Sequence, residues 1–242
     1  MSVDGVRAPR DVLSLLEHGQ VRIEGRLIDA SNATLYCCVR LRAESAHAVY
    51  KPIAGERPLW DFPDGTLAAR EMAAYLVSEA LGWKIVPPTV LRAGPLGDGM
   101  LQQWIEVDEA VDVTRLVRGR DSQLRRMALF DAVVNNADRK GGHLLPTPSG
   151  HVYGIDHGVC FHRDDKLRTV LWQWRGRPLD GEDTDALTGL RADLDAGLGE
   201  RLGGLLTGRE VAATGARVDR LLATRRFPLP SGDWPAIPWP PF

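Results

Sequence analysis

The hydrophobic pattern of the N-terminal part of the chain predicts an antiparallel sheet of short strands accompanied by helices. Apolar residues recur every three or four positions in the helical stretches, and they gather in short runs bounded by turn residues where strands are predicted. Helices are predicted over residues 11–19 and 66–81, and strands over residues 21–28, 34–41, 46–52, 85–91 and 100–106. Thr66 can cap the second helix and Gly82 can end it. The polar segment 29–33 turns the first two strands into a hairpin.

Helical spacing dominates the rest of the chain. Predicted helices cover residues 112–117, 122–135, 184–206 and 207–223, and the last of them opens with a capping-box pattern. A turn over residues 146–150 joins two short strands that lie between these helices. The proline-rich segment 227–242 carries two tryptophans and Phe242, which are costly to leave in water. We therefore expect this segment to strap over the helical part rather than to recruit a polyproline-binding partner.

Composition and charge indicate an ordinary globular protein. The chain of 242 residues is 44% apolar and 26% charged, and its net charge of −2 argues against a general nucleic-acid-binding protein. No apolar run approaches the ~18 residues of a transmembrane helix, and the sequence starts without the basic and apolar regions of a signal peptide. The three cysteines include no Cys-x-x-Cys pair. Together these features favour a reduced, cytoplasmic protein.

Two acidic residues mark the stretch where chemistry is expected. Asp138 comes shortly after the predicted helix 122–135, and Asp156 follows the second of the two short strands. Because a hairpin places the outer ends of its strands side by side, both carboxylates are expected to face one small volume. Two carboxylates with a neighbouring lysine and histidine suit a divalent cation held against phosphate oxygens. The alternative is that both aspartates only cap turns.

The spacing of these residues resembles the catalytic motifs of kinases. The run Asp-Arg-Lys-Gly-Gly-His over residues 138–143 is similar to the Asp-Arg-His-x-x-Asn motif of the phosphatidylinositol 3- and 4-kinase-like family, which includes HipA-type protein kinases. The run Asp-His-Gly over residues 156–158 stands where this family has its hydrophobic-Asp-x-Gly motif, the counterpart of Asp-Phe-Gly. The resemblance is strongest over the stretch of about 30 residues that contains the two motifs, and weaker matches extend it over roughly residues 20–175.

Two residues depart from the family motif. Lys140 replaces the family histidine, and it occupies the position of the lysine that Ser/Thr protein kinases use against the γ-phosphate. His143 replaces the metal-binding asparagine. An imidazole nitrogen suits Mn²⁺ or Zn²⁺ better than the oxygen-seeking Mg²⁺. The exchange therefore predicts either a shifted metal preference or a weakened enzyme.

The resemblance implies an α+β, two-lobed protein-kinase-like fold. Residues 1–104 would form a small antiparallel β lobe with one helix, and residues 105–242 would form a mainly helical catalytic lobe that ends in the proline-rich segment 227–242. The implied activity is transfer of the γ-phosphoryl group of ATP to a protein serine or threonine hydroxyl, or to the protein itself. The implied cofactors are ATP and Mg²⁺ or Mn²⁺, and the unidentified acceptor is expected to be a protein.

The same resemblance assigns roles to residues in both halves of the chain. The implied site comprises the catalytic Asp138 and Lys140, the metal ligands His143 and Asp156, and the nucleotide-binding Ser31, Asn32, Lys51, Glu71, Gln103, Trp104 and Ile105. Asp138 would accept or orient the hydroxyl proton of the acceptor. Lys51, held by Glu71, would grip the α- and β-phosphates. The last three residues lead into the linker between the lobes, where backbone groups bind adenine.

Several of these assignments have a plainer alternative. Ser31 and Asn32 fit an ordinary hairpin turn as well as a loop over ATP. A lone lysine such as Lys51 is usually a solvated residue at the edge of a sheet. Glu71 could equally form a surface charge cluster with Arg70.

Other functions remain as alternatives to phosphoryl transfer. A zinc hydrolase is disfavoured, because the histidines at 143, 151, 157 and 162 form no His-Glu-x-x-His pattern. The main alternative from another class is a nucleotide-binding pseudokinase that acts as an interaction module. A phosphatidylinositol lipid kinase is a further alternative. The segment 162–177, which selects the acceptor in this branch, is short and mixed in charge, and it favours a protein acceptor over an inositol lipid.

Overall fold

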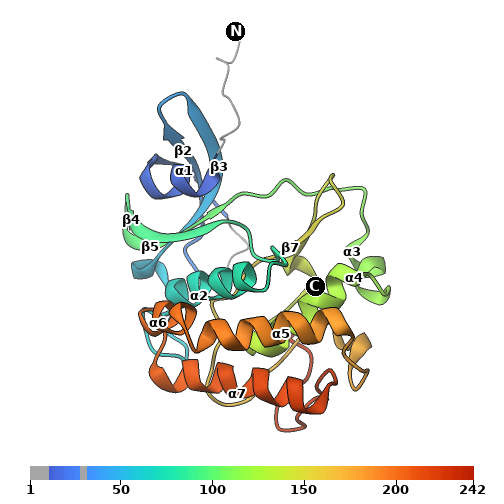
Figure 1. Cartoon of the computed structure of the whole chain (residues 1–242). Helices are drawn as coiled ribbons and strands as arrows, with labels where there is room; N and C mark the ends of the chain where they lie inside the picture. Colours follow the sequence, from blue (N-terminus) through green and yellow to red (C-terminus); the bar gives the residue numbers. More distant parts are fainter. Residues whose placement is uncertain (1–10, 28–31) are drawn as a thin grey trace.

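The computed structural model describes residues 11–27 and 32–242, which include a five-stranded antiparallel sheet of order β1-β2-β3-β5-β4 (Figure 1). Its strands are β1 Gln20–Arg26, β2 Leu35–Leu41, β3 Glu44–Pro52, β4 Thr89–Gly94 and β5 Gly97–Gln103. A separate two-stranded sheet pairs β6 Leu144–Pro146 with β7 Val152–Gly154. The predicted hairpins of both regions are therefore confirmed.

Strand β3 lies in the middle of the larger sheet, between β2 and β5. Its pairing with β5 sets Lys51 opposite Met100. Lys51 is therefore not an edge residue, and its side chain is only 18% exposed. The sheet packs against helix α1, Val12–His18, around a small core of its own. That core contains Leu15, Leu16, Cys37, Val39, Tyr50 and Leu101.

Helix α2, Leu67–Ala80, lies between the larger sheet and the C-terminal helices (Figure 1). Ala73, Ala74 and Val77 are fully buried in the same core as those C-terminal helices. Arg70 and Glu71 are also buried, at 1% and 2% exposure. The alternative of a surface charge cluster at these two residues is therefore wrong.

The N-terminus of α2 is capped by a side chain of the preceding loop. The side chain of Thr66, the predicted cap, makes no cap hydrogen bond and donates instead to the carbonyl oxygen of Pro63 at 2.7 Å. The carboxylate of Glu56 accepts from the N–H groups of Leu67 and Ala68 at 3.1 and 2.8 Å. A negative charge at this end also complements the helix dipole. The prediction failed because the cap comes from the preceding loop rather than from the helix itself.

Five helices follow β5 in the described chain. They are α3 Val113–Arg118, α4 Ser122–Val134, α5 Gly181–Leu194, α6 Gly197–Gly203 and α7 Gly208–Thr224. Three single-turn 3-10 helices are found elsewhere in the described chain, namely η1 Ile53–Gly55, η2 Gly141–His143 and η3 Trp172–Trp174. Helices α5 and α7 pack side by side beneath α2 (Figure 1). Within residues 11–27 and 32–242, none of the helices combines the length and apolar character needed to span a bilayer.

The continuous helix predicted over residues 184–206 is wrong. The chain leaves the helical conformation at Ala196, and α5 and α6 form on either side of that break. Gly197 and Gly199 follow the break, and glycine has a low helix propensity. A Cβ atom at Gly199 would collide with the carbonyl oxygen of Leu194, so the tight turn requires glycine there. The leucines on both sides of the break are still buried together, because Leu198 and Leu202 of α6 pack into the same core as the leucines of α5.

The strand predicted over residues 85–91 begins later, at Thr89. Ile85 and Val86 are buried in the helical core instead. Pro87 and Pro88 separate them from β4, and proline cannot donate a hydrogen bond to a neighbouring strand. The next strand, β5, ends at Gln103 rather than at residue 106.

The segment 228–242 runs over the helical half of the molecule without forming a helix or strand. The carbonyl oxygen of Ala236 accepts from the backbone N–H of Thr169 at 3.0 Å and from the indole N–H of Trp172 at 2.8 Å. Further along, the carbonyl oxygen of Pro241 accepts from the N–H of Gly141 at 2.8 Å. The predicted strapping is therefore confirmed.

Candidate active site

Two adjoining cavities form a cleft that is lined by β3, α2 and the loops of residues 138–143 and 155–159. One cavity has a volume of about 250 Å³ and the other of about 670 Å³. They share the lining residues Thr34, Lys51, Asp138 and Asp156. The two predicted acidic residues therefore face one cleft together with Lys51.

Every predicted site residue that the structure describes lines this cleft. The smaller cavity is also lined by Asn32 and Glu71. The larger cavity is also lined by Gln103, Trp104, Ile105, Lys140 and His143. Ser31 lies outside the described residues. The loop after β3, which contributes Glu56, Arg57 and Leu59, forms another wall of the smaller cavity.

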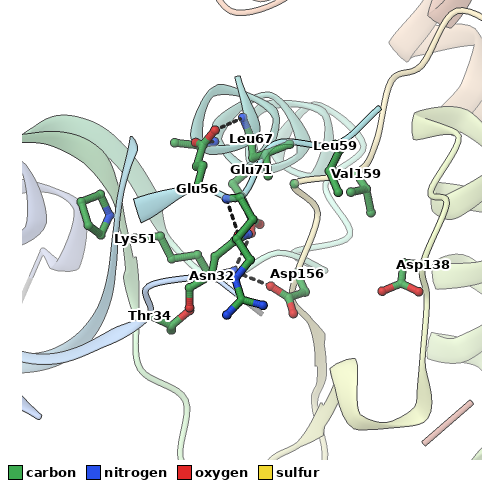
Figure 2. Close-up of a pocket in the computed structure, with 14 residues that line it drawn as sticks. Asn32, Thr34, Lys51, Glu56, Leu59, Leu67, Glu71, Asp138, Asp156 and Val159 are labelled. Carbon is green, nitrogen blue, oxygen red and sulfur yellow. Dashed lines mark hydrogen bonds and ion pairs between the residues drawn. The ribbon is translucent and has the colours of Figure 1, made fainter. Parts of the chain in front are cut away.

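Lys51 lies between two carboxylates (Figure 2). Its ammonium nitrogen is 2.8 Å from Oε1 of Glu71 and also contacts Oδ1 of Asp156. Burial alone would lower the pKa of Lys51, but the negative charges of Asp156 and Glu71 raise it overall. Lys51 is therefore a fixed positive charge at the junction of the two cavities.

Glu71 is held in place from two sides. Its Oε1 contacts Lys51, and its Oε2 accepts from the backbone N–H of His157 at 2.8 Å. Next to it on α2, Arg70 donates to Oε1 of Glu210 at 2.6 Å and to the carbonyl oxygen of Cys160 at 2.8 Å. These contacts attach α2 to helix α7 and to the loop after β7. Glu71 is therefore presented to Lys51 by a helix that is fixed to the helical half.

Asp156 follows β7 and adopts the left-handed backbone conformation, with φ of +64°. Aspartate tolerates this conformation better than most residues that carry a Cβ atom. The positive charge of Lys51 is the main cause of the lowered pKa of Asp156, and it outweighs burial, which acts in the opposite direction. Asp156 is therefore ionised at neutral pH.

Arg139 organises the loop that carries Asp138. Its guanidinium pairs with Asp131 at 2.9 Å and donates to the carbonyl oxygen of Ile155 at 2.9 Å. It also lies 2.6 Å from Nε2 of His157, and burial lowers the pKa of this histidine well below its usual value. A neutral imidazole can accept from the guanidinium at that nitrogen. Arg139 thus connects the 138–143 loop to the 155–159 loop.

Asp138 lines the same cavity as Asp156 with a partly exposed carboxylate (Figure 2). Its backbone N–H donates to Oδ1 of Asn136 at 2.9 Å, which fixes the loop. The ammonium of Lys140 lies 3.2 Å from its Oδ2. Burial raises the pKa of Asp138, and the charge of Lys140 opposes that change. A carboxylate with a raised pKa is a better proton acceptor than an ordinary aspartate.

His143 lies beside Asp156, with 3.4 Å between its Nε2 and Oδ2 of the carboxylate. Burial lowers the pKa of His143 to about 4, so the imidazole is neutral at pH 7. Its Nδ1 accepts from the backbone N–H of Lys140 at 3.4 Å. That contact leaves the ring proton on Nε2, where it faces Asp156. Ligation of a cation by Nε2 requires the other tautomer.

The donor set fits a divalent cation that takes most of its ligands from phosphate and water. Among residues 11–27 and 32–242, no three His, Cys, Asp or Glu side chains are grouped so that they could hold a metal. Asp156 supplies an ionised carboxylate and His143 a neutral imidazole. Mg²⁺ bound with nucleotides is commonly held by one or two protein carboxylates, the rest of its shell being phosphate oxygens and water.

Three organising residues escaped the sequence analysis. Arg139 is part of the motif of residues 138–143 but had no predicted role, although it connects both loops of the site. Asp131 was the polar exception on an otherwise apolar helix face, and such an exception signals a buried partner. Glu56 left no signal in the sequence, because its contact with α2 depends on the path of a loop.

The fold is similar to two solved structures. One is described as the Golgi casein kinase with Mn/ADP bound, with a TM-score of 0.59 and 15% identity over 88% of this chain and 74% of that chain. The other is described as hydra Fam20 with sugar, with a TM-score of 0.60 and 15% identity over 88% of this chain and 86% of that chain. The predicted two-lobed, protein-kinase-like α+β fold is therefore confirmed.

Sequence similarity adds a coarse assignment. Phosphatidylinositol 4-kinase gamma 4 of Arabidopsis thaliana is 28% identical over 163 residues, which cover 55% of this chain and only 29% of the plant protein. Together with the fold, this match supports the coarser part of the predicted resemblance, a relationship to an atypical kinase-like family. No family model matches the chain.

One relative matches along nearly the whole chain. Protein Rv2133c of Mycobacterium tuberculosis is 44% identical over an alignment of 267 positions that covers 96% of either protein. Identity at that level over almost the full length establishes common membership, and the chain belongs to the same protein family as Rv2133c.

Proposed function

We propose that this protein is an ATP-dependent phosphotransferase. The observation that carries the proposal is the position of Lys51, which lies against both Glu71 and Asp156 in a cleft that Asp138 also lines. Phosphoryl transfer requires positioned positive charge, a cation site and a carboxylate at the acceptor, and these groups supply all three. Under the proposed division into lobes, residues 1–104 and 105–242, this cleft would lie between the sheet and the helices.

The nucleotide would lie along both cavities. The base would occupy the larger cavity beside Gln103, Trp104 and Ile105, and the phosphates would extend toward Lys51. The N–H of Trp104 already donates to the carbonyl oxygen of His47 at 3.0 Å. Within the part of the chain that the structure describes, the backbone groups of Ile105 form no hydrogen bond, so they are free to bind a base. Asn32 would cover the phosphates from the hairpin side.

Asp156 and His143 would hold a divalent cation, Mg²⁺ or Mn²⁺. When bound, the cation would neutralise charge on the phosphate oxygens. The protein's own contribution is the charge of Lys51, which keeps Asp156 ionised and adds positive charge beside the phosphates. Glu71 holds that lysine in place at 2.8 Å.

Asp138 would act on the acceptor. Its carboxylate would receive the proton of an acceptor hydroxyl while the hydroxyl oxygen bonds to the γ-phosphorus and the bond from that phosphorus to the bridging oxygen breaks, releasing ADP. General-base positioning of this kind typically contributes about 10²–10⁴ in rate. Lys140, 3.2 Å from the carboxylate of Asp138, would neutralise the charge of the transferred group.

The proposed acceptor is a serine or threonine hydroxyl of a protein, or of this chain itself. The relationship to HipA-type protein kinases belongs to the same proposal and rests on the motifs of residues 138–143 and 156–158. A lipid kinase is the second candidate, because the plant relative is named a phosphatidylinositol 4-kinase. The mixed charge of residues 162–177 supports the protein acceptor over the lipid.

The test is transfer of label from γ-labelled ATP with Mg²⁺ or Mn²⁺. We expect label on the protein or on an added mixture of serine- and threonine-containing peptides, and little or none on phosphatidylinositol vesicles. Asp138→Asn should reduce transfer by about 10²–10⁴ without loss of folding. The exposed Asp185→Asn is the matched control and should keep full activity. Nucleotide binding without transfer in the unaltered protein would favour the pseudokinase, and full activity of Asp138→Asn would refute the assignment.

A further inference from the structure

The segment 228–242 is anchored to the molecule at several points along its length. Trp234 packs over the ammonium of Lys166, 4.6 Å from its ring centre, and stacks on Trp60 with 6.1 Å between ring centres. Lys166 is 5% exposed and pairs with Asp61 at 2.5 Å. The carbonyl oxygen of Ala236 is held by two hydrogen bonds from residues 169–172. The segment therefore has a defined path rather than a free one.

This path ends in the candidate active site. The carbonyl oxygen of Pro241 accepts from the N–H of Gly141, only three residues after Asp138. A Cβ atom at Gly141 would collide with the ring of Phe242, so the ring lies directly against this backbone. Figure 1 accordingly marks the last residue near the middle of the molecule, away from the end of α7.

Phe242 and Pro240 line the larger cavity together with the linker between the sheet and the helices. The remaining apolar walls come from several elements of both halves, namely Leu27, Val49, Ile105, Val107, Leu145 and Ile155. Lys51 and Asp156 lie at the polar end of the same cavity. An apolar chamber with a charged end matches a ligand that has an aromatic base at one end and phosphates at the other.

The ring of Phe242 forms a wall of this chamber and does not fill it. With the ring in place the cavity still measures about 670 Å³, and ligand pockets typically measure about 300–1,000 Å³. Phe242 also remains 53% exposed, although it is anchored through its neighbour Pro241. An aromatic ring that lines a cavity and stays about half exposed is available to pack against a planar ligand.

We propose that Phe242 is a nucleoside-binding residue, whose ring packs against the base of the nucleotide that enters the cleft. The inference rests on the proposed function for the nature of the ligand. It gives the segment 228–242 a direct contact with the base, although this segment lies outside residues 20–175, over which the kinase resemblance runs. The apolar side chains of Ile105 and Leu145 would contact the same base from the other walls. Removing the ring should weaken binding of the nucleoside part and leave phosphate binding unchanged.

The experiment compares two probes, ADP and inorganic pyrophosphate, each titrated by calorimetry in the presence of Mn²⁺ or Mg²⁺. Phe242→Ala should weaken ADP binding by about tenfold, the loss expected for one base–aromatic stack, and should leave pyrophosphate binding unchanged. Phe242→Tyr keeps a ring and should bind both probes as the unaltered protein does. Trp239→Ala is the matched control, because Trp239 belongs to the same segment, is 84% exposed and does not line the cavity.

Gly141→Ala provides an independent variant, because its methyl group displaces the ring without removing it. It should also weaken ADP binding more than pyrophosphate binding. Unchanged ADP binding in Phe242→Ala overturns the proposal, and tighter ADP binding overturns it in favour of a segment that blocks the site. Normal ADP binding with no phosphoryl transfer in the unaltered protein would remove the proposed activity and leave the role of Phe242 standing. Failure of the unaltered protein to bind ADP would overturn both.

Discussion

The guanidinium of Arg139 lies 2.9 Å from the carboxylate of Asp131, and neither side chain is exposed to solvent. Asp131 lies within helix α4, and Arg139 directly follows Asp138. The same carboxylate also accepts from Nδ2 of Asn136 at 3.0 Å. The pair therefore connects the loop of the proposed base to helix α4, nine of whose 13 residues are buried, so that the position of Asp138 depends on the integrity of the core.

Replacing Arg139 should destabilise the fold strongly. Arg139→Met leaves Asp131 buried without a counter-charge, and the loss of one partner of a buried pair typically costs about 3–5 kcal/mol. The free energy of unfolding, measured by urea denaturation, should fall by about that amount. The control is Arg126→Met, which breaks an exposed pair with Glu182 at 3.0 Å and should cost less than about 1 kcal/mol. Similar losses in the two variants would contradict a structural role for the buried pair.

Neutralising Glu71 should reduce phosphoryl transfer. Glu71→Gln keeps the shape of the side chain but removes one of the two charges beside Lys51. Hydrogen bonds to charged groups contribute about 1.5–3 kcal/mol, so kcat/KM for ATP should fall by about 10- to 100-fold. Glu79 lies on the same helix but is exposed, and Glu79→Gln should retain the activity of the unaltered protein. Equal activity of both variants would mean that Lys51 needs no support from α2.

The sequence predicted the local parts of the fold well, because hydrophobic periodicity and turn residues report on local structure. The three-strand run that ends at Lys51 and the helix before Asp138 both formed where expected. The break at Ala196 and the start of β4 at Thr89 were missed. In both places residues that break regular structure decided the outcome, Gly197 and Gly199 after the break and Pro87 and Pro88 before the strand, and hydrophobic periodicity does not report on them.

The residues of the site were predicted from the order of two motifs. The contacts that hold these residues in place were not predicted. The pairing of Lys51 with Glu71 could be anticipated, since both residues occupy familiar positions relative to the motifs. The contacts of Arg70 with Glu210 and of Glu56 with α2 join residues that the sequence gives no reason to connect. Phe242 reaches the cleft for the same reason, through a path that only the folded chain defines.

The pair of Arg70 and Glu210 should make stability dependent on acid pH. Burial alone would raise the pKa of Glu210, but hydrogen bonds from Thr207 and Arg70 lower it overall below the ordinary value of 4.5. A carboxyl group with a lowered folded-state pKa stabilises the fold fully above its unfolded pKa, and this contribution is lost as pH falls through the folded value.

We therefore expect the stability advantage of the unaltered protein over Glu210→Gln to be largest at neutral pH and to shrink below about pH 4.5. Urea midpoints measured from pH 7 downward test this expectation. Glu200→Gln, at an exposed position on α6, should track the unaltered protein at every pH. A constant difference between the unaltered protein and Glu210→Gln across this range would contradict the assignment of the lowered pKa to the pair.

The choice of metal should depend on His143. An imidazole nitrogen binds Mn²⁺ better than Mg²⁺, whereas an amide oxygen suits Mg²⁺. Ligation by Nε2 also requires the ring proton to move to Nδ1, which would cost the 3.4 Å contact with the N–H of Lys140. His143→Asn removes that requirement and offers an oxygen beside Asp156.

We expect this variant to shift the ratio of transfer rates from Mn²⁺ toward Mg²⁺, measured with γ-labelled ATP at matched concentrations of the two ions. The control is His151→Asn, since His151 lies outside the cleft, where its Nε2 is 2.9 Å from the carbonyl oxygen of Lys84. That variant should keep the original ratio. If His143→Asn keeps the ratio as well, the imidazole acts only as a hydrogen-bond donor to Asp156, and the cation is held by the carboxylate, phosphate and water.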